Sequence, residues 1–340
     1  MTYKITIKPS NHELVAEGGE TLLEAALREG YALPYGCRNG ACGSCKGKVL
    51  EGRVDHGSYH EHALSAADKS AGLTLFCCAK PLSDVTIEAR EIAAAKDIAV
   101  KMMPCRVEKI EKPAPDVAIL TLKLPASERL QFLAGQYVEI LLKDGKRRAF
   151  SLANAPHDDA FLQLHIRHVP GGEFTGYVFG EMQEKTILRF QGSFGTFFLR
   201  EDSDKPIVLV ASGTGFAPIK SILEHAFHNR HQRTMTLYWG ARTPRDLYLA
   251  DLPRQWAHQH ANFTYVPVVS EPPPGDSWQG RTGFVHQAVL DDFADLSGFQ
   301  VYACGAPPMV AAARESFTGL RGLPQGEFFS DAFSFAGNGK

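Results

Sequence analysis

The sequence predicts a multidomain chain that combines α+β and α/β folds, with an antiparallel β-barrel in the middle and a parallel sheet after it. Three observations support this fold class. The chain has 340 residues, which is enough for two or three cores. Short alternating strands with turn signals between them fill the middle of the chain. Beyond residue 203, strand-like and helix-like segments alternate, which is typical of a parallel sheet.

Composition and charge narrow the classes of function. Apolar residues make up 44% of the chain and charged residues 22%, as in ordinary globular proteins. The 36 basic and 38 acidic residues give a net charge of −2, so we expect neither a nucleic-acid partner nor a membrane surface. The N-terminal segment has no apolar leader and no run of eighteen apolar residues occurs. We therefore expect a cytoplasmic protein, whose thiols stay reduced.

Residues 1–95 are expected to form a first, mixed domain. Alternation near the N-terminus predicts a strand, and a second apolar stretch predicts a hairpin. The following segment, "GGETLLEAALREG", predicts a short helix that begins with a capping box of Thr21 and Glu24 and ends at Gly30. Residues 96–104 lack periodicity and end in proline, so we expect a linker there.

Three cysteines, Cys37, Cys42 and Cys45, stand in the stretch "YGCRNGACGSCKG" with the spacing C-x4-C-x2-C. The segment "LTLFCCAKPLSD" offers Cys77 or Cys78 as a fourth ligand. This is the spacing of a plant-type [2Fe–2S] site. Zinc fits less well because only one C-x2-C pair exists, and disulfides fit an odd count of seven cysteines poorly. Strand alternation predicts that one of the two adjacent cysteines faces the cluster and the other faces away.

Residues 105–202 contain the segments expected to build the barrel, and one of them, "RRAFSLAN", carries chemistry. Arg148 is suited to pair with a pyrophosphate, Phe150 to stack on a flat ring, and Ser151 to hydrogen-bond to the edge of that ring. The alternative is an ordinary edge strand with a polar end. In "HIRHVPGGEFTGYVF", a glycine pair precedes a helix whose free N–H groups are suited to hold phosphate.

Residues 203–340 begin with "IVLVASGTGFAPIKSIL", an apolar strand that runs through Gly213, Thr214 and Gly215 into a helix. This order of strand, glycine turn and helix places a dinucleotide's phosphates at a helix N-terminus. A plain strand–helix turn is the alternative, because the third glycine of the usual motif is missing. In "YACGAPPMV", Cys304 ends another strand, either beside the nucleotide or as a packing thiol.

Four motifs in this order, "CRNGACGSC", "RAFSLAN", "GTGFAP" and "CGAPPM", resemble the ferredoxin–NADP reductase-like superfamily in the form with an N-terminal plant-type ferredoxin domain. The resemblance covers nearly the whole chain. It implies a β-grasp ferredoxin domain over residues 1–95, a linker over 96–104, an FAD-binding antiparallel β-barrel over 105–202 and a parallel α/β NAD(P)H-binding domain over 203–340.

The resemblance also implies roles for individual residues. It makes Cys77 the fourth iron ligand beside Cys37, Cys42 and Cys45, and leaves Cys78 as a buried packing thiol. The implied FAD contacts come from Arg148, Phe150, Ser151, Asn154, His165, Arg167, Gly171, Gly172 and Thr175. The implied nicotinamide dinucleotide contacts come from Gly213, Thr214, Gly215 and Cys304. A C-terminal segment with Phe333 is implied to cover the flavin, and the alternative is a last strand of the sheet.

The implied activity is that of an NAD(P)H-dependent oxidoreductase. NAD(P)H gives two electrons as hydride and a [2Fe–2S] cluster accepts one at a time, so FAD must stand between them. We expect Ser151 and Cys304 to act as catalytic residues by positioning the two rings. The choice between NADH and NADPH stays open, since Arg242 and Arg245 are either ligands of a 2′-phosphate or surface residues.

The implied partner is an electron-accepting protein. The segments "YWGA", "TGFVHQAVLDD" and "FFSDAF" are most similar to reductases that serve dehydrases of nucleotide-linked deoxysugars. The alternative partner is an aromatic-ring mono- or dioxygenase. A third hypothesis, a non-catalytic zinc-stabilised binding module, predicts a colourless protein.

Overall fold

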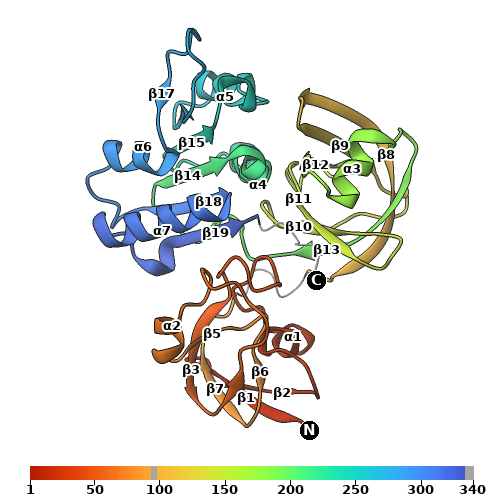
Figure 1. Cartoon of the computed structure of the whole chain (residues 1–340), viewed down its shortest axis with the longest axis vertical. Coiled ribbons are helices and arrows are strands. Elements are labelled where there is room, and N and C mark those ends of the chain that lie inside the picture. The colour runs from red at the N-terminus through yellow and green to blue at the C-terminus, as the bar shows by residue number, and fades with distance from the viewer. Residues whose placement is uncertain (93–97, 334–340) are drawn as a thin grey trace. The chain divides into compact units, whose positions relative to one another are not determined.

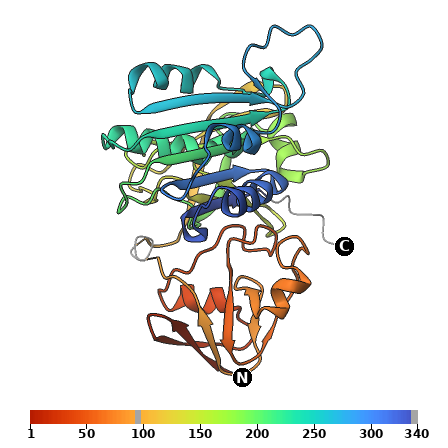
Figure 2. The same cartoon turned by 90° about the vertical axis from the view of Figure 1, so that its left-hand side faces the viewer.

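The computed structural model describes residues 1–92 and 98–333. It divides into two compact units, Met1–Ala99 and Val100–Lys340 (Figure 1, Figure 2). Among the described helices, none has the length and apolar character that crossing a bilayer requires.

The first unit is built on a five-stranded mixed sheet in the order β2-β1-β7-β3-β5. β1 forms an antiparallel hairpin with β2 and pairs in parallel with β7, while a separate pair joins β4 and β6. The elements are β1 (Tyr3–Lys8), β2 (His12–Ala16), α1 (Leu22–Arg28), β3 (Lys46–Glu51), β4 (Val54–Asp55), α2 (Ala66–Ser70), β5 (Leu73–Leu75), β6 (Lys80–Pro81) and β7 (Val85–Glu88).

Helix α1 confirms the helix predicted from its caps. The Thr21 side chain accepts from the N–H of Glu24 at 3.2 Å, and the Glu24 carboxylate accepts from the N–H of Thr21 at 2.9 Å. Gly30 follows the helix with φ +82°, a conformation that favours glycine. Leu22, Leu23 and two alanines of α1 are buried, so the apolar face fixes the helix in the unit.

The predicted linker reaches too far along the chain. Residues 93–97 lie outside the described residues, and strand β8 (Lys101–Ala114) already begins at Lys101. Pro104 was expected to end the linker, yet it lies within β8, opposite Arg189 of β13. At this point β8 is paired on one side only, because its pairing with β9 begins at Arg106. A proline is tolerated in such a strand.

The second unit begins with a six-stranded antiparallel sheet in the order β11-β10-β13-β8-β9-β12. An isolated antiparallel bridge between Leu152 and Leu164 connects its two edges. Val107, Leu120 and Phe190 lie in its buried core. Besides β8, the elements are β9 (Val117–Lys123), β10 (Tyr137–Leu141), β11 (Arg147–Ser151), β12 (Phe161–Arg167), α3 (Glu173–Gly180) and β13 (Ile187–Phe194).

The rest of the second unit confirms the predicted parallel sheet, in the order β17-β16-β15-β14-β18-β19. α4 and α5 cover one face and α6 and α7 the other (Figure 1). The elements are β14 (Ile207–Ser212), α4 (Phe216–His228), β15 (Met235–Ala241), α5 (Asp251–Gln259), β16 (Phe263–Val269), β17 (Arg281–Thr282), α6 (Val285–Asp292), β18 (Gln300–Gly305), α7 (Pro307–Leu320) and β19 (Phe328–Ala332). Short 3₁₀ turns cover Gly213–Gly215, Pro244–Asp246 and Gln325–Glu327.

Candidate functional site

The cysteine loop of the first unit, residues 35–45, has no regular secondary structure and wraps with the help of glycines. Gly40 and Gly43 have φ of +75° and +72°. A Cβ at Gly40 would lie 2.8 Å from the Cys78 sulfur and 2.9 Å from the Ser58 carbonyl oxygen. The loop therefore needs glycine at position 40 both for its conformation and for space.

The four cysteines proposed from the sequence interact in two pairs. The N–H of Cys37 donates to the Cys42 sulfur at 3.3 Å, and the N–H of Cys42 donates back to the Cys37 sulfur at 3.3 Å. Cys45 and Cys77 influence each other's pKa most strongly, and the N–H of Phe76 donates to the Cys45 carbonyl at 3.1 Å. Within the described residues, no three His, Cys, Asp or Glu side chains gather around one point as the ligands of a single metal ion do. Two pairs of sulfurs are the arrangement that a binuclear cluster needs.

The surroundings of the cysteines stabilise the thiolate of Cys37 and that of Cys77. The neighbouring Cys42 and the N–H groups of Asn39, Cys42 and Ala41 lower the pKa of Cys37 to about 7. Cys45 and Cys78 lower the pKa of Cys77 to about 3. The same partners and burial raise the pKa values of Cys42 and Cys45, so each pair ionises one sulfur first. Metal ligands must be thiolates, and this donor set fits an iron–sulfur cluster.

Cys77 and Cys78 depart from the predicted alternation. Strand β5 ends at Leu75, and residues 76–78 form a turn in which the N–H groups of Cys78 and Ala79 both donate to the Leu75 carbonyl, at 3.0 and 2.9 Å. The two sulfurs consequently lie 3.5 Å apart instead of on opposite faces. Cys78 is only half-buried, so the expectation of a buried packing thiol is wrong. Cys105, in β8, is buried.

Strand β11 carries the three residues predicted to meet a flavin. The Arg148 guanidinium donates to the Arg147 carbonyl at 2.9 Å and has no carboxylate partner among the described residues. Phe150 packs on Phe174 of α3, with ring centroids 5.3 Å apart. Ser151 is buried, and its hydroxyl has no hydrogen-bond partner within the described chain. A free cation, an aromatic ring and a free hydroxyl on one strand fit the edge of a flavin.

Two other predicted flavin residues are occupied by the protein itself. The Asn154 amide donates to the Asp158 carbonyl at 2.8 Å and accepts from the N–H of Gln163 at 2.9 Å. The buried His165 ring contacts Gln163 Oε1 at 3.2 Å through Nε2 and the Tyr248 hydroxyl at 2.8 Å through Nδ1. Burial, with a smaller effect of Lys220, lowers the pKa of His165 to about 3. These contacts favour a structural role for both side chains.

The neutral His165 ring therefore links two parts of the second unit. A glutamine oxygen only accepts, so Nε2 carries the proton and donates to Gln163, and Nδ1 accepts from the Tyr248 O–H. Tyr248 is itself buried and follows the parallel strand β15. Sequence reasoning missed it, because the two partners are 83 residues apart and no local pattern marks their contact.

Arg167, at the end of β12, stands between the two sheets. Its Nε lies 3.2 Å from the Asp116 carboxylate, and a Cβ at Gly213 would lie 3.1 Å from its Nη1. The guanidinium thus borders the glycine turn after β14, where it is also suited to meet a phosphate. The sequence predicted Arg167 as a flavin contact only and did not predict that it borders the glycine turn.

The N-terminus of α3 has the free donors predicted for phosphate. Gly172 is the N-cap, and no side chain of residues 1–92 or 98–333 caps this end. Gly171 has φ +74°. The Thr175 hydroxyl donates to Val169 O at 3.2 Å and accepts from its N–H at 3.1 Å, so it closes the loop before the helix. The donors that remain for a phosphate are backbone amides of the first helical turn.

The turn Gly213–Gly215 leads directly from β14 into α4, as the sequence predicted. The indole of Trp239 donates to the Gly213 carbonyl at 3.0 Å. A Cβ at Gly215 would overlap the carbonyl group of Cys304. Thr214 is buried between these two glycines. The turn is therefore packed so closely against β18 that only glycine fits at position 215.

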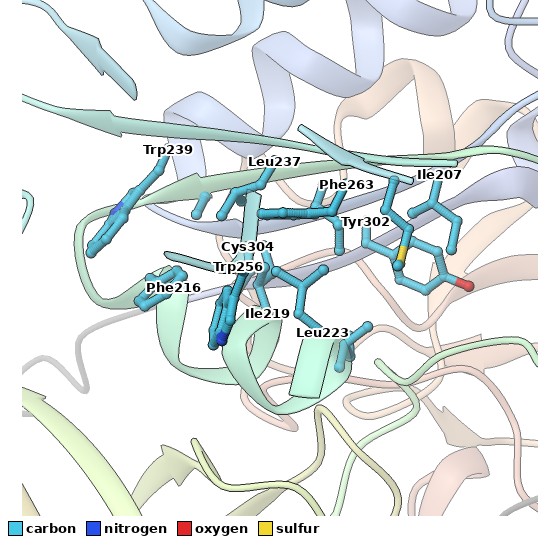
Figure 3. Packing of buried hydrophobic residues seen from close by; sticks show 14 of the residues in the cluster. Ile207, Phe216, Ile219, Leu223, Leu237, Trp239, Trp256, Phe263, Tyr302 and Cys304 are labelled. Atoms are coloured by element: carbon cyan, nitrogen blue, oxygen red, sulfur yellow. The ribbon is translucent and has the colours of Figure 1, made fainter. Parts of the chain in front are cut away.

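The backbone of Cys304 lies beside this turn, but its side chain lies in the hydrophobic core. Cys304 is fully buried in the core with Phe216 and Trp256 (Figure 3). Burial, together with Asp331, raises the pKa of its thiol. In this conformation the thiol is a packing group, which was the alternative to a position at a nicotinamide ring.

The C-terminal segment forms a strand that extends the parallel sheet. β19 pairs with β18, and the N–H of Phe333 donates to the Gly305 carbonyl at 2.8 Å. Phe333 packs against the core while partly exposed. The alternative of a last strand is thus confirmed, and a cover over the flavin stays a prediction.

Family models match the chain in three consecutive segments. A 2Fe-2S iron-sulfur cluster binding domain matches residues 5–82, an oxidoreductase FAD-binding domain 104–199 and an oxidoreductase NAD-binding domain 209–315. The CDP-6-deoxy-L-threo-D-glycero-4-hexulose-3-dehydrase reductase of Yersinia pseudotuberculosis is 42% identical over 98% of this chain and 99% of its own. The chain belongs to the ferredoxin–NADP reductase-like family, in the form with a [2Fe–2S] domain.

This reductase is also similar to components of oxygenase systems. The terephthalate 1,2-dioxygenase reductase component 1 of Comamonas is 35% identical over all of this chain and 99% of its own. The solved cytochrome P450 reductase of Amycolatopsis is 34% identical, with a TM-score of 0.78 over 98% of this chain and 99% of its own. The reductase is an NAD(P)H-dependent oxidoreductase whose domains for NAD, FAD and a [2Fe–2S] cluster form an electron-transfer chain.

Proposed function

We propose that this reductase supplies electrons to a dehydrase that acts on a CDP-linked 6-deoxyhexulose. One observation carries the proposal. The relative named for that dehydrase shares 42% identity over 98% of the chain, whereas the dioxygenase reductase shares 35% over all of it. The electron-accepting partner is then the dehydrase protein itself. We propose neither a nucleic acid nor a membrane as a further partner.

A second candidate is the reductase component of an aromatic-ring oxygenase. It is favoured by the likeness to the terephthalate dioxygenase reductase and by the fold shared with the cytochrome P450 reductase. Both candidates use the same relay and differ only in the protein that takes the electrons.

We propose Cys37, Cys42, Cys45 and Cys77 as the ligands of the cluster. The sulfur pairs support the assignment, with Cys37 beside Cys42 and Cys45 beside Cys77. The loop amides donate to sulfur and so stabilise the negative charge of the thiolates. The mixed sheet and α1 support a β-grasp ferredoxin domain, within residues 1–95 as expected from the sequence.

We propose that FAD lies along β11 and α3, on the antiparallel sheet that the Leu152–Leu164 bridge brings close to a barrel. When bound, the flavin takes hydride from NAD(P)H and hands on single electrons. Arg148 and the first amides of α3 would hold its pyrophosphate, Phe150 would pack on its ring and Ser151 would donate to the ring edge.

We propose the turn Gly213–Gly215 as the phosphate site of NAD(P)H. Its place before α4, the absence of a side-chain cap among the described residues there, and the neighbouring guanidinium of Arg167 support this assignment. Cys304 would shape the floor of the site as a buried group. We further propose a cytoplasmic location, which suits seven free cysteines that include the cluster ligands.

A reconstituted assay tests the proposed partner. The purified reductase with NADH is mixed either with the sugar dehydrase and its CDP-linked substrate or with an aromatic-ring oxygenase component and its aromatic substrate. We expect turnover with the dehydrase only. Turnover with the oxygenase and none with the dehydrase would overturn the assignment and leave the relay intact.

A further inference from the structure

A fifth sulfur, that of Cys78, lies beside one of the four proposed cluster ligands. The Cys78 sulfur lies 3.5 Å from the Cys77 sulfur. It also lies against the loop itself, since a Cβ at Gly40 would come within 2.8 Å of it. The turn that follows Leu75 brings both sulfurs to one side, because the N–H groups of residues 78 and 79 share the Leu75 carbonyl.

We propose that Cys78 is a reserve ligand of the cluster, which takes the iron position of Cys77 when the sulfur of residue 77 is removed. The inference rests on the proposed cluster site. Cys78 is partly exposed to solvent, and a change of its χ1 angle moves its sulfur between staggered positions. The sulfur of Cys78 already lies 3.5 Å from that of Cys77, so the exchange requires a side-chain rotation and no refolding of the loop.

The exchange keeps the chemistry of the site balanced. Cys78 binds iron as a thiolate, so its thiol releases one proton to solvent as the iron–sulfur bond forms. No electron is transferred and no other reactant is needed. The cluster keeps four thiolate ligands and its net charge, while the position of one ligand changes. A change of ligand position alters the spectrum of the cluster without removing it.

Four variants test the inference: Cys77→Ala, Cys78→Ala, the double variant, and Cys37→Ala as the matched loss of a ligand that has no adjacent cysteine in the sequence. The measured quantities are iron and acid-labile sulfide per bound FAD, and the electron paramagnetic resonance spectrum of the dithionite-reduced protein. Alanine is used because serine could itself bind iron. FAD is the internal standard, since its proposed residues lie in the other compact unit.

We expect Cys78→Ala to keep the wild-type iron content and Cys77→Ala to keep more than half of it, with shifted g-values. The double variant and Cys37→Ala are expected to retain less than a tenth. An iron content of Cys77→Ala as low as that of Cys37→Ala overturns the reserve role. If both are empty after purification, both are treated with ferrous iron and sulfide. Recovery of Cys77→Ala alone supports the inference, and any other result overturns it.

The same experiment separates this inference from the proposed function. A wild-type protein that holds neither iron nor sulfide contradicts the proposed relay as a whole. A loaded wild-type protein with an empty Cys77→Ala variant contradicts the reserve ligand alone.

Discussion

Removing the hydroxyl of Tyr248 tests how the parallel sheet is joined to the antiparallel sheet in the second unit. Tyr248→Phe deletes the donor that the Nδ1 of His165 accepts at 2.8 Å. Tyr265→Phe in β16 of the same unit is the matched control, because the Tyr265 hydroxyl is buried without a hydrogen-bond partner among the described residues. The two substitutions remove the same atom, once from a hydrogen bond to His165 and once from a buried hydroxyl that makes none among the described residues.

The magnitude follows from what each substitution leaves behind. Tyr248→Phe leaves the buried Nδ1 acceptor of His165 without a donor, and an unsatisfied buried group costs about 1–3 kcal/mol. Taking about 2 kcal/mol, and about 2–4 °C per kcal/mol for a unit of this size, we expect Tm to fall by about 4–8 °C. Tyr265→Phe removes a hydroxyl that was already unsatisfied, so we expect no loss of stability or a small gain.

Tryptophan fluorescence during thermal and urea unfolding measures this difference in one unit. All three tryptophans, at positions 239, 256 and 278, belong to the second unit, so unfolding of the first unit does not enter the signal. Equal shifts in the two variants, or a larger loss in Tyr265→Phe, would refute the argument that the His165–Tyr248 hydrogen bond joins the two sheets.

Three further predictions concern pH, the nucleotide turn and the cluster. The pKa of His165 is lowered from 6.5 to about 3, so His165 stays neutral in the folded protein at pH values where the unfolded chain already takes up a proton. The free energy of unfolding is therefore largest above pH 6.5 and decreases as the pH is lowered below that value. At pH 5 the free energy of unfolding is about 2 kcal/mol lower than above pH 6.5 because of His165. In urea unfolding, His165→Gln should lack this part of the pH dependence, and an unchanged pH dependence of the variant would contradict the prediction. Gly215→Ala should slow NADH-driven flavin reduction at least tenfold in stopped-flow traces, because the Cβ overlaps the carbonyl of Cys304, while Gly176→Ala, with nothing within 4 Å, should not. Cys42→Ala should abolish the iron–sulfur absorption bands and cytochrome c reduction but leave NADH–ferricyanide activity, and loss of both activities would argue against separate flavin and cluster domains.

Local patterns predicted the backbone of this reductase well. The capping box of Thr21 and Glu24 predicted α1, because both of its hydrogen bonds lie within one helical turn. The alternation of strands and helices predicted the parallel sheet. The linker failed at Pro104 because a strand tolerates proline where one edge is unpaired, and the pairing of an edge is decided by residues far along the chain.

Side-chain placement in the site depended on contacts that the local sequence does not contain. Cys304 was expected at a strand end, and its backbone lies there, but whether its thiol faces a ligand or the core is decided by Phe216 and Trp256 from two helices. Cys78 was expected to face away because strands alternate, and the turn after Leu75 cancels that alternation. The spacing of the cysteines therefore predicts the four cluster ligands. The turn of residues 76–78 determines that the sulfurs of Cys77 and Cys78 both lie on the side of the cysteine loop. For a cluster site, the conformation between the last strand and the last cysteine is as informative as the number of residues between the cysteines.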